Sequence, residues 1–508
     1  MRLKQFSGKL LLIPVAVGTL LCSCMEPTDE KNTLTVDPES SFTYDINGNV
    51  SFFDSTLEED KDNDEKEFKK KITINFNGAA KPTIEPAETE GVKIDNSEKG
   101  KAHLIIKSSE KINYVLKGES ANGSLLIFSQ KKFKLTLDNL KLSNDAGVPA
   151  ISSQTKKRCF IETVGTATIK DAQAYSLPEA YKIKDANGEY VLEDDGKIAC
   201  YDAKGAIFSE GEIIFCGNGT LNVEGRTKHA IASDQYVRLL SGTVNVTGSK
   251  KDGIHTNDAV LINGGKLDIS GIVVTDPNNK DDNKEVKKFN GIECEKGYIV
   301  IMDGEITIKS PGIGIYASKE EFSKSDVMAE KSFIFINGGK INIVTNEERG
   351  HGINSVSHMI IKGGEIDIKA LGESAKGLRT DFNKVEDEKE AENGNITLTG
   401  GTINIFCVDK ALDPEGKLNI LGGTINAIGG DCFERTQILA GSKPCGIATF
   451  DSPITKDDEI SFEGTKISTV AVAKTLNKAY AVFVKDGLVA GATPEVKIGS
   501  QKVKADVK

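Results

Sequence analysis

The sequence predicts an all-β fold, a parallel β-helix built as a solenoid of short coils. Three observations predict it: a repeated glycine phrase, the short period of that phrase, and a second phrase that occurs once in each period. The first phrase is a glycine pair followed by an alternating apolar and polar run, as in Asn337-Gly-Gly-Lys-Ile-Asn-Ile. Its second glycine, or the equivalent residue, falls at Gly219, Gly242, Gly265, Gly304, Gly339, Gly364, Gly401 and Gly423.

The spacing of these glycines predicts the length of one coil. The short intervals lie near 23 residues, and the longer ones contain charged inserts such as 276–284, 319–326 and 383–393. A unit of that length is within the range of small solenoid repeats and too short for a pair of helices. The runs around the glycines alternate in polarity and are rich in β-branched residues, so we expect two strands per phrase with the glycine at the bend between them.

The second phrase is a small residue followed by an aliphatic one, and it predicts a third strand in each coil. It occurs at Ala150-Ile151, Ala206-Ile207, Ala230-Ile231, Gly253-Ile254, Gly291-Ile292, Gly314-Ile315, Gly352-Ile353, Gly377-Leu378 and Ala411-Leu412. The two phrases together predict the β-helix over residues 115–445, with a long insert at 171–203 that packs over the first coils.

The segments on either side of the coils have strand-like patterns of their own. Residues 33–114 are predicted as an N-terminal β region and residues 446–508 as a C-terminal β cap. A solenoid needs caps because its end coils would otherwise expose their apolar faces.

The extreme N-terminus has the layout of an export signal, with basic residues before the apolar run 10–21. The following Leu21-Cys22-Ser23-Cys24 resembles a bacterial lipobox, which implies that residues 1–23 are removed and that Cys24 is lipidated. Residues 24–32 then form an acidic tether like that of bacterial surface lipoproteins. We expect an exported outer-membrane lipoprotein at the cell surface that meets the membrane only through its N-terminal lipid.

Composition excludes several classes of function. The formal net charge is −11 and no stripe of lysine and arginine is evident, so nucleic acid is not an expected partner. The chain has no tryptophan and 6% aromatic residues, which argues against a flat stacking platform for crystalline cellulose. The seven cysteines after Cys24 lack the spacing of a zinc site, and their pairing stays open.

Stacked coils place equivalent residues about 4.8 Å apart, so each outward position becomes a row along the solenoid. The residue after the aliphatic of the second phrase predicts a ligand-binding row: His255, Glu293, Tyr316, Asn354 and Arg379, followed by Asp413. The glycines beside this row serve either the approach of a polymer or only the corner of the coil. A second row follows the glycine pairs and is either a hydrogen-bonded amide ladder or a polar face for sugar hydroxyls: Asn222, Asn245, Asp268, Thr307, Asn342, Asp367, Asn404 and Asn426.

Carboxylates concentrate at two coil corners and predict Ca²⁺, which takes six to eight oxygen ligands. Asp252 and Asp258 lie close together in the sequence, and Asp409 and Asp413 lie at the matching point of a later coil. These four residues are the candidate calcium ligands, although acidic loop residues often face only water.

The segment 251–269, Lys251-Asp-Gly-Ile-His-Thr-Asn-Asp followed by Ala-Val-Leu-Ile-Asn-Gly-Gly-Lys-Leu-Asp-Ile, resembles the repeat unit of bacterial calcium-dependent carbohydrate-binding β-helix proteins. That family is itself similar to family 9 pectate lyases. The resemblance covers residues 110–445 and implies a right-handed β-helix that binds acidic, pectin-like polysaccharide with Ca²⁺. Lys251, Lys376 and Lys410 stand where the repeat has aspartates, which implies that some calcium sites are lost.

The expected function is therefore non-catalytic binding of polysaccharide. A calcium-dependent polysaccharide lyase is the main alternative, with Lys376 or Arg379 as base and Asp381 beside them. An adhesin that contacts surface proteins without affinity for glycans is the third hypothesis.

Overall fold

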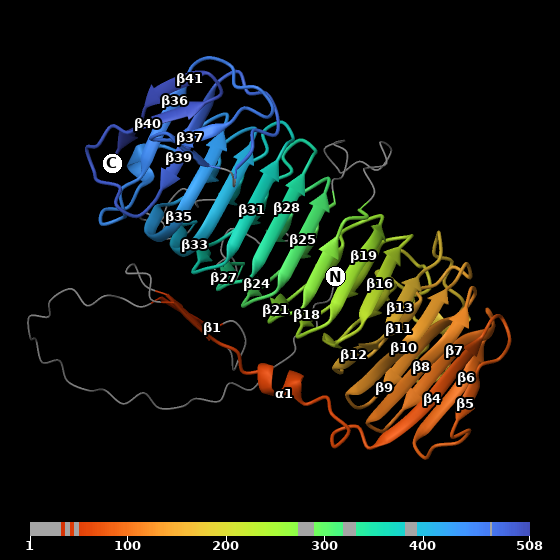
Figure 1. The fold of residues 1–508 in the computed structure, drawn as a ribbon. Helices are drawn as coiled ribbons and strands as arrows, with labels where there is room; N and C mark the ends of the chain where they lie inside the picture. The colour runs from red at the N-terminus through yellow and green to blue at the C-terminus, as the bar shows by residue number, and fades with distance from the viewer. Residues whose placement is uncertain are drawn as a thin grey trace, which may run out of the picture.

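The computed structural model describes residues 32–35, 41–44, 50–272, 289–318, 332–381, 394–467 and 470–508. The described chain is nearly all β, and most of its strands run parallel in two large sheets (Figure 1). Its helical segments are α1 (Leu57–Lys61) and the 3₁₀ turns η1 (Glu179–Tyr181) and η3 (Arg435–Gln437). None of the helices in these ranges is long and apolar enough to cross a bilayer. The predicted signal, Cys24 and nearly all of the tether lie outside the described residues.

The parallel strands form three ladders, in which each strand pairs with its equivalents one repeat earlier and one repeat later (Figure 1). The first ladder contains β4 (Lys70–Asn77), β8 (Ile112–Ser120), β10 (Phe133–Ser143), β12 (Cys159–Val164), β15 (Ile213–Gly217), β18 (Tyr236–Leu239), β21 (Ala259–Ile262), β24 (Tyr298–Ile301), β27 (Ile334–Ile336), β30 (Met359–Ile361), β33 (Ile396–Cys407) and β35 (Leu418–Gly429). The second contains the ends of β10, β33 and β35 together with β13 (Thr166–Lys170), β16 (Thr220–Gly225), β19 (Thr243–Ser249), β22 (Lys266–Ile269), β25 (Glu305–Ser310), β28 (Lys340–Thr345) and β31 (Glu365–Ala370).

The third ladder is a separate sheet and carries the second phrase of the sequence. It contains β6 (Val92–Ser97), β7 (Gly100–Ser108), β9 (Ser124–Ser129), β11 (Ile151–Ser153), β14 (Gly205–Ser209), β17 (His229–Ser233), β20 (Ile254–Thr256), β23 (Ile292–Cys294), β26 (Ile315–Ala317), β29 (Ile353–Ser355), β32 (Leu378–Thr380) and β34 (Leu412–Asp413). Within it only β6 pairs antiparallel, with β7, among the described strands.

The remaining strands lie at the ends of the stack or along its side. They are β1 (Asn32–Thr35), β2 (Ser41–Tyr44), β3 (Val50–Phe53), β5 (Thr83–Glu85), β36 (Gly446–Phe450), β37 (Ile460–Phe462), β38 (Thr465–Ile467), β39 (Ala479–Val484), β40 (Glu495–Ile498), β41 (Gln501–Lys504) and β42 (Asp506–Val507). The prediction of an all-β chain is thus confirmed. Parallel pairing extends upstream of residue 115, because β4 already pairs in parallel with β8.

The core lies between the three ladders and is filled by the inward residues of every strand. In one repeat, Ile292, Ile299 and Ile306 come from the three ladders in turn, and each is at most 1% exposed. Alternation along each strand sends the neighbouring residues outward, which is how the rows on the surface arise.

The glycines of the second phrase are explained by this core. A Cβ on Gly314 would lie 2.4 Å from Cγ2 of the inward Ile343 and 2.6 Å from the carbonyl oxygen of Gly352 in the next repeat. The corner of the repeat therefore excludes any side chain at this position, whether or not a ligand approaches from outside.

Candidate functional site

The ligand-binding row of the sequence forms one straight line across the third ladder. Strand register pairs its members in the order His255, Glu293, Tyr316, Asn354, Arg379 and Asp413. Five of them come from the middle of a three-residue strand, and Asp413 comes from the end of the two-residue β34. The row therefore places six polar side chains in succession along one face, of which His255 and Asn354 are buried.

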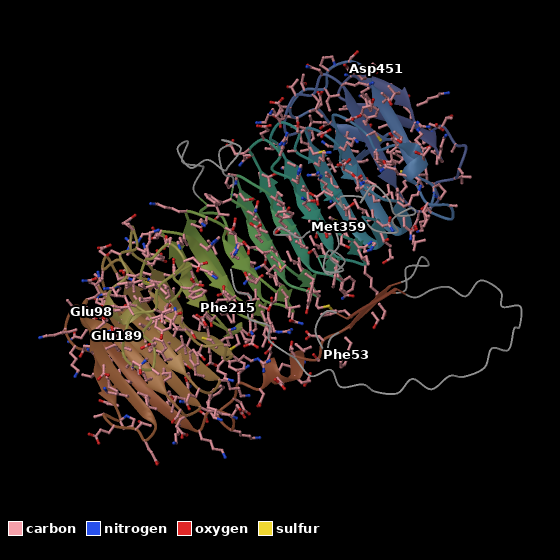
Figure 2. All side chains as sticks on the ribbon, turned by 180° about the vertical axis from the view of Figure 1, so that it is seen from behind. Phe53, Glu98, Glu189, Phe215, Met359 and Asp451 are labelled. Atoms are coloured by element: carbon pink, nitrogen blue, oxygen red, sulfur yellow. The ribbon has the colours of Figure 1, made fainter. Side chains whose placement is uncertain are left out.

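The insert limits this row at its N-terminal side. Upstream, the same outward position is occupied by Ala232, Phe208, Ser152 and Leu126, and Tyr181 from the insert packs on Leu126. The insert also bonds to the turn between β6 and β7, where the Ala180 N–H donates to Glu98 Oε1 at 3.3 Å. Figure 2 labels Glu98 and Glu189 at this end of the molecule. The predicted packing of the insert over the first repeats is therefore observed.

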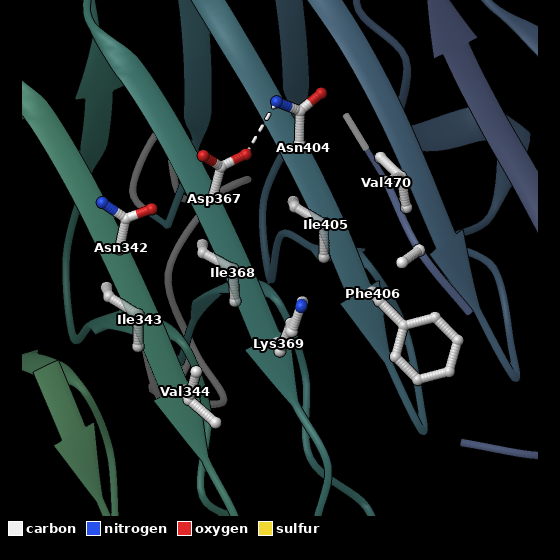
Figure 3. Close-up of a pocket in the computed structure, with 11 residues that line it drawn as sticks. Asn342, Ile343, Val344, Asp367, Ile368, Lys369, Asn404, Ile405, Phe406 and Val470 are labelled. Carbon is white, nitrogen blue, oxygen red and sulfur yellow. Dashed lines mark hydrogen bonds between the residues drawn. The ribbon is translucent and has the colours of Figure 1, made fainter. Parts of the chain in front are cut away.

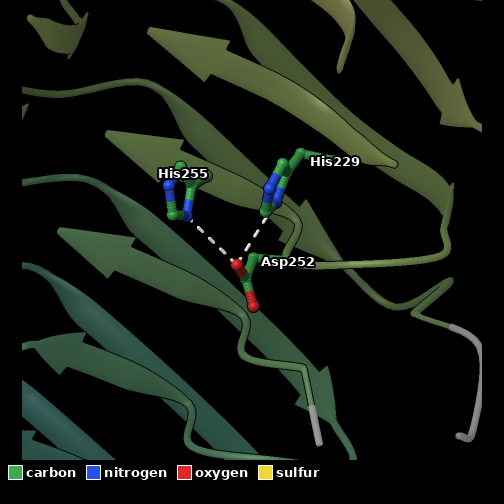
Figure 4. A group of neighbouring side chains, drawn as sticks. All are labelled: His229, Asp252 and His255. Carbon is green, nitrogen blue, oxygen red and sulfur yellow. Dashed lines mark hydrogen bonds and ion pairs between the residues drawn. The ribbon is translucent and has the colours of Figure 1, made fainter. Parts of the chain in front are cut away.

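A histidine and carboxylate cluster lies at the open start of the row (Figure 4). Oδ2 of Asp252 is 3.2 Å from Nδ1 of His229 and 3.2 Å from Nδ1 of His255. The other carboxylate oxygen of Asp252 accepts the backbone N–H of Asn290 at 2.7 Å. Nε2 of His255 is 3.2 Å from Oε1 of Glu295, and the two imidazole rings stack with centroids 4.2 Å apart.

The two stacked histidines differ in protonation. Burial works against a charged imidazole, but the carboxylates of Asp252 and Glu295 raise the pKa of His255 to about 10. Burial lowers the pKa of His229 to about 4, so His229 is neutral. Although burial opposes it, hydrogen bonding to the two histidines holds the pKa of Asp252 below its usual value. The cluster thus holds one imidazolium between two carboxylates.

Glu293, the next residue in the row, has a different environment. Burial, followed by the nearby charge of Asp252, raises the pKa of Glu293 to about 8. Its Oε2 accepts Nδ2 of Asn290 at 2.8 Å. Glu293 is therefore protonated at neutral pH and acts as a neutral polar group in the row.

The donors around Asp252 only partly suit Ca²⁺, which prefers six to eight oxygen ligands. Both oxygens of Asp252 are engaged by histidines and a backbone amide, and imidazole nitrogen suits transition metals better than calcium. His229, Asp252 and His255 are the residues whose donor atoms lie together, within 4.8 Å of one another. The other predicted ligand, Asp258, is exposed and follows β20, whereas Asp252 precedes it.

Cations surround the second predicted calcium pair. Nζ of Lys376 lies 2.5 Å from Oδ2 of Asp413 and 3.6 Å from Oδ2 of Asp409. Nζ of Lys410 lies 3.3 Å from the other oxygen of Asp413. Burial alone would raise the pKa of Asp413, but these lysines lower it. Ca²⁺ at this point would have to displace an ammonium group, so the residues present do not fit the ion.

Arg379 lies beside this lysine group. Its guanidinium NH1 is 3.0 Å from Nε2 of His351 and 3.6 Å from Oδ2 of Asp381, and its Nε is 3.8 Å from Oδ2 of Asp413. Nδ2 of Asn354, the preceding residue of the row, donates to Oδ2 of Asp381 at 3.3 Å.

Sequence reasoning missed His229, Glu295 and His351. His229 and His351 belong to the position directly before the small residue of the second phrase, which Asp252 and Lys376 occupy in other repeats. Backbone bonds align this position from repeat to repeat, for example Gly352 N–H to the carbonyl of Lys376. Reading the phrase one residue further upstream would have found both histidines.

The second row, after the glycine pairs, forms a hydrogen-bonded amide ladder over part of its length. Nδ2 of Asn404 donates to Oδ1 of Asp367 at 2.8 Å, and Nδ2 of Asn245 donates to Oδ1 of Asn222 at 2.9 Å. A groove of about 250 Å³ follows this row at Asn342, Asp367 and Asn404, where Val470 of the C-terminal segment forms one wall (Figure 3).

Comparison with known proteins assigns most of the chain to a protein family. The family model of carbohydrate-binding domain-containing proteins matches residues 99–348 and 290–434, together more than half of the sequence. A polysaccharide lyase-like protein from C. thermocellum, solved as a gadolinium derivative, aligns at a TM-score of 0.38 and 17% identity, over 62% of this chain and 98% of that one. At that TM-score the likeness carries no argument about activity. No curated protein matches the sequence.

Proposed function

The chain belongs to the family of carbohydrate-binding domain-containing proteins, and from this premise we propose that it binds polysaccharide along the row from His255 to Asp413 without cleaving it. The observation that carries the proposal is the register of six outward polar residues on successive strands. A polymer with regularly spaced hydroxyl groups meets a regularly spaced set of hydrogen-bonding groups on such a face.

The finer parts of the proposal concern the ligand, the ion and the location. The repeats are interpreted as coils of a right-handed parallel β-helix, and the favoured ligand is an acidic, pectin-like glycan. Asp252 and Asp258 are the residues that would hold Ca²⁺, and the ion would supply the largest local charge there for an acidic glycan. The protein acts at the cell surface as an outer-membrane lipoprotein attached through Cys24.

Binding is favoured over lyase activity by the state of Lys376. A base that removes a proton from the sugar must be a free amine, but the Lys376 ammonium is paired with Asp413 and Asp409. Incubation with polygalacturonate and calcium separates the two activities, since a lyase forms an unsaturated product that absorbs ultraviolet light. We expect no increase in absorbance.

A glycan array, run with calcium and with excess chelator, tests binding and its ion dependence. The full chain is expected to retain acidic polysaccharides, and Tyr316→Ala is expected to weaken this retention because it removes the largest side chain of the row. Lys340→Ala, on the second ladder, is the matched control and should bind normally. If the protein binds no glycan on the array, the proposal is wrong and the adhesin hypothesis remains. If it binds with full affinity in excess chelator, Ca²⁺ does not assist binding.

A further inference from the structure

The guanidinium group of Arg379 is the least well paired cation in the row. Its Nε is buried and makes no hydrogen bond among the described residues. The carboxylates of Asp381 and Asp413 lie 3.6 and 3.8 Å from its nitrogens, beyond good hydrogen-bonding distance. The Arg379 side chain as a whole is nevertheless 30% exposed, so a ligand can contact the side chain from outside.

The contact of Arg379 with His351 does not satisfy the guanidinium. The backbone N–H of Lys376 donates to Nδ1 of His351 at 3.1 Å, and NH1 of Arg379 approaches Nε2 at 3.0 Å. A neutral imidazole accepts at one nitrogen and carries a proton on the other. In either tautomer, one of the two contacts therefore brings two donors together.

Protonation of His351 cannot relieve this conflict, because an imidazolium donates at both nitrogens. Burial, followed by the charges of Arg379 and Lys376, lowers the pKa of His351 to about 3. The ring stays neutral, so the conflict falls either on Arg379 or on the Lys376 amide, and in both cases the Nε–H of Arg379 has no acceptor among the described residues.

The neighbouring carboxylates do not complete the hydrogen bonding of Arg379. Asp413 is held by the ammonium groups of Lys376 and Lys410, at 2.5 and 3.3 Å. Asp381 accepts Nδ2 of Asn354 at 3.3 Å through Oδ2, and its Oδ1 makes no hydrogen bond in the described part of the chain. An acceptor brought by a ligand would therefore give the guanidinium a partner that the arrangement of these carboxylates does not supply.

We propose that Arg379 is a direct, calcium-independent anchor for the carboxylate of an acidic sugar. This deepens the proposed function and rests on it. A guanidinium presents two parallel N–H groups to a carboxylate, a geometry that a lysine cannot reproduce. Lys376 and Lys410 neutralise Asp413 beside it, so that carboxylate opposes a bound anion less.

A methyl ester of the sugar is uncharged and offers only a neutral acceptor to the N–H groups of Arg379. The ligand class is therefore a uronic acid polymer with free carboxylates, and its methyl ester is discriminated against.

The test compares two forms of one ligand. Titration calorimetry of the full chain with oligogalacturonate and with the fully methyl-esterified oligomer, both in excess chelator, isolates recognition of the carboxylate from any role of Ca²⁺. We expect the free acid to bind about tenfold or more tightly than the ester, the size of one good charged hydrogen-bonding pair. Arg379→Gln should abolish this preference, and Arg379→Lys should restore only part of it.

Lys340→Gln, which removes an exposed cation from the second ladder, is the control for net charge and should keep the full preference. The inference about Arg379 would be overturned if the wild type bound acid and ester equally, or if a folded Arg379→Gln variant kept the full preference. Either result would leave the proposed function standing. A preference that appears only with calcium would also overturn the inference about Arg379. A wild type that binds neither form, in chelator and with calcium added, would overturn the proposed function as well, so the two failures are distinguishable.

Discussion

At the scale of single residues, burial and not sequence separation decides the charge states of the row. His255 and Glu293 are register partners, yet the first is an imidazolium and the second a neutral acid. Burial is the main cause of the raised pKa of Glu293, and the carboxylate of Asp252 adds to it by repelling an anion, whereas the same carboxylate stabilises the cation on His255. The start of the row therefore carries less net negative charge than its carboxylates alone would suggest.

This environment makes stability dependent on pH through Glu293. The pKa of Glu293 is raised from 4.5 to about 8 on folding. Its contribution to the stability of the folded state is therefore fully present below pH 4.5 and is lost as the pH rises through 8. Glu293→Gln should lose less stability than the wild type between pH 5 and pH 8. Over that interval the free energy of unfolding of the variant, relative to that of the wild type, should rise by on the order of 1–4 kcal/mol. Urea denaturation at a series of pH values measures the difference.

The matched control is Glu305→Gln, on the exposed surface, where the acid pairs with Lys266 at 3.0 Å. Its stability should follow the pH dependence of the wild type. Parallel curves for Glu293→Gln and the wild type would show that Glu293 is ionised in the folded protein.

At the scale of strands, the corner between the second and third ladders controls how closely repeats approach. Gly253, Gly291 and Gly314 occupy equivalent corners. A Cβ added to any of them would lie 2.4 to 2.6 Å from an inward isoleucine side chain of the second ladder. The corner is therefore sufficient to explain these glycines. Close approach of a polymer to the backbone is not needed to account for them.

Gly314→Ala should therefore destabilise the fold by about 1–3 kcal/mol, the usual cost of overpacking a core. The new methyl group would press on Ile343 and on the carbonyl of Gly352. Gly264→Ala is the control, because its nearest neighbour is the Leu240 carbonyl oxygen at 3.2 Å and the backbone there is not left-handed. Thermal denaturation of both variants checks this, and equal losses would contradict the packing account.

At the scale of the whole molecule, the ends and one side of the stack are closed by segments from the two ends of the chain. Near the N-terminus, Asp54 and Asp60 bind the buried guanidinium of Arg238 at 2.8 and 2.5 Å and hold the segment around α1 against the first ladder. At the C-terminus, β39 pairs antiparallel with both β35 and β36 and so ends the parallel pairing. Exposed edge strands promote association, and β39 covers the edge of β35.

Truncation after Cys445 should therefore produce an associating protein. It removes β39, uncovers the edge of β35 and exposes Phe406 and Ile428, which are 1% and 2% exposed in the full chain. Size-exclusion chromatography with light scattering, at several concentrations and beside the intact chain, measures the effect. A truncated chain that remains monomeric and melts at the same temperature would show that the last 63 residues do not cap the stack.

The fold was largely predictable because its information is local and repeated. Each glycine phrase specifies its strands within a few residues, and equivalent residues then align when the repeats stack, as the register of His255 with Glu293 shows. The candidate site was only half predictable. Its row positions came from the phrase, and Lys376 and Lys410 already implied that some calcium sites are lost, but the sequence did not show that both lysines pair with Asp413.

The sequence by itself determined the all-β class, the period and the order of side chains along the row, because these depend on alternation and on glycine positions in the chain. Tertiary structure alone decided which groups carry charge and which lack partners. Arg379, His351 and Asp413 are brought together from three repeats, and Arg238 meets Asp54 across 184 positions of sequence. Charge pairing and burial depend on distances through space, and no pattern along the chain contains them.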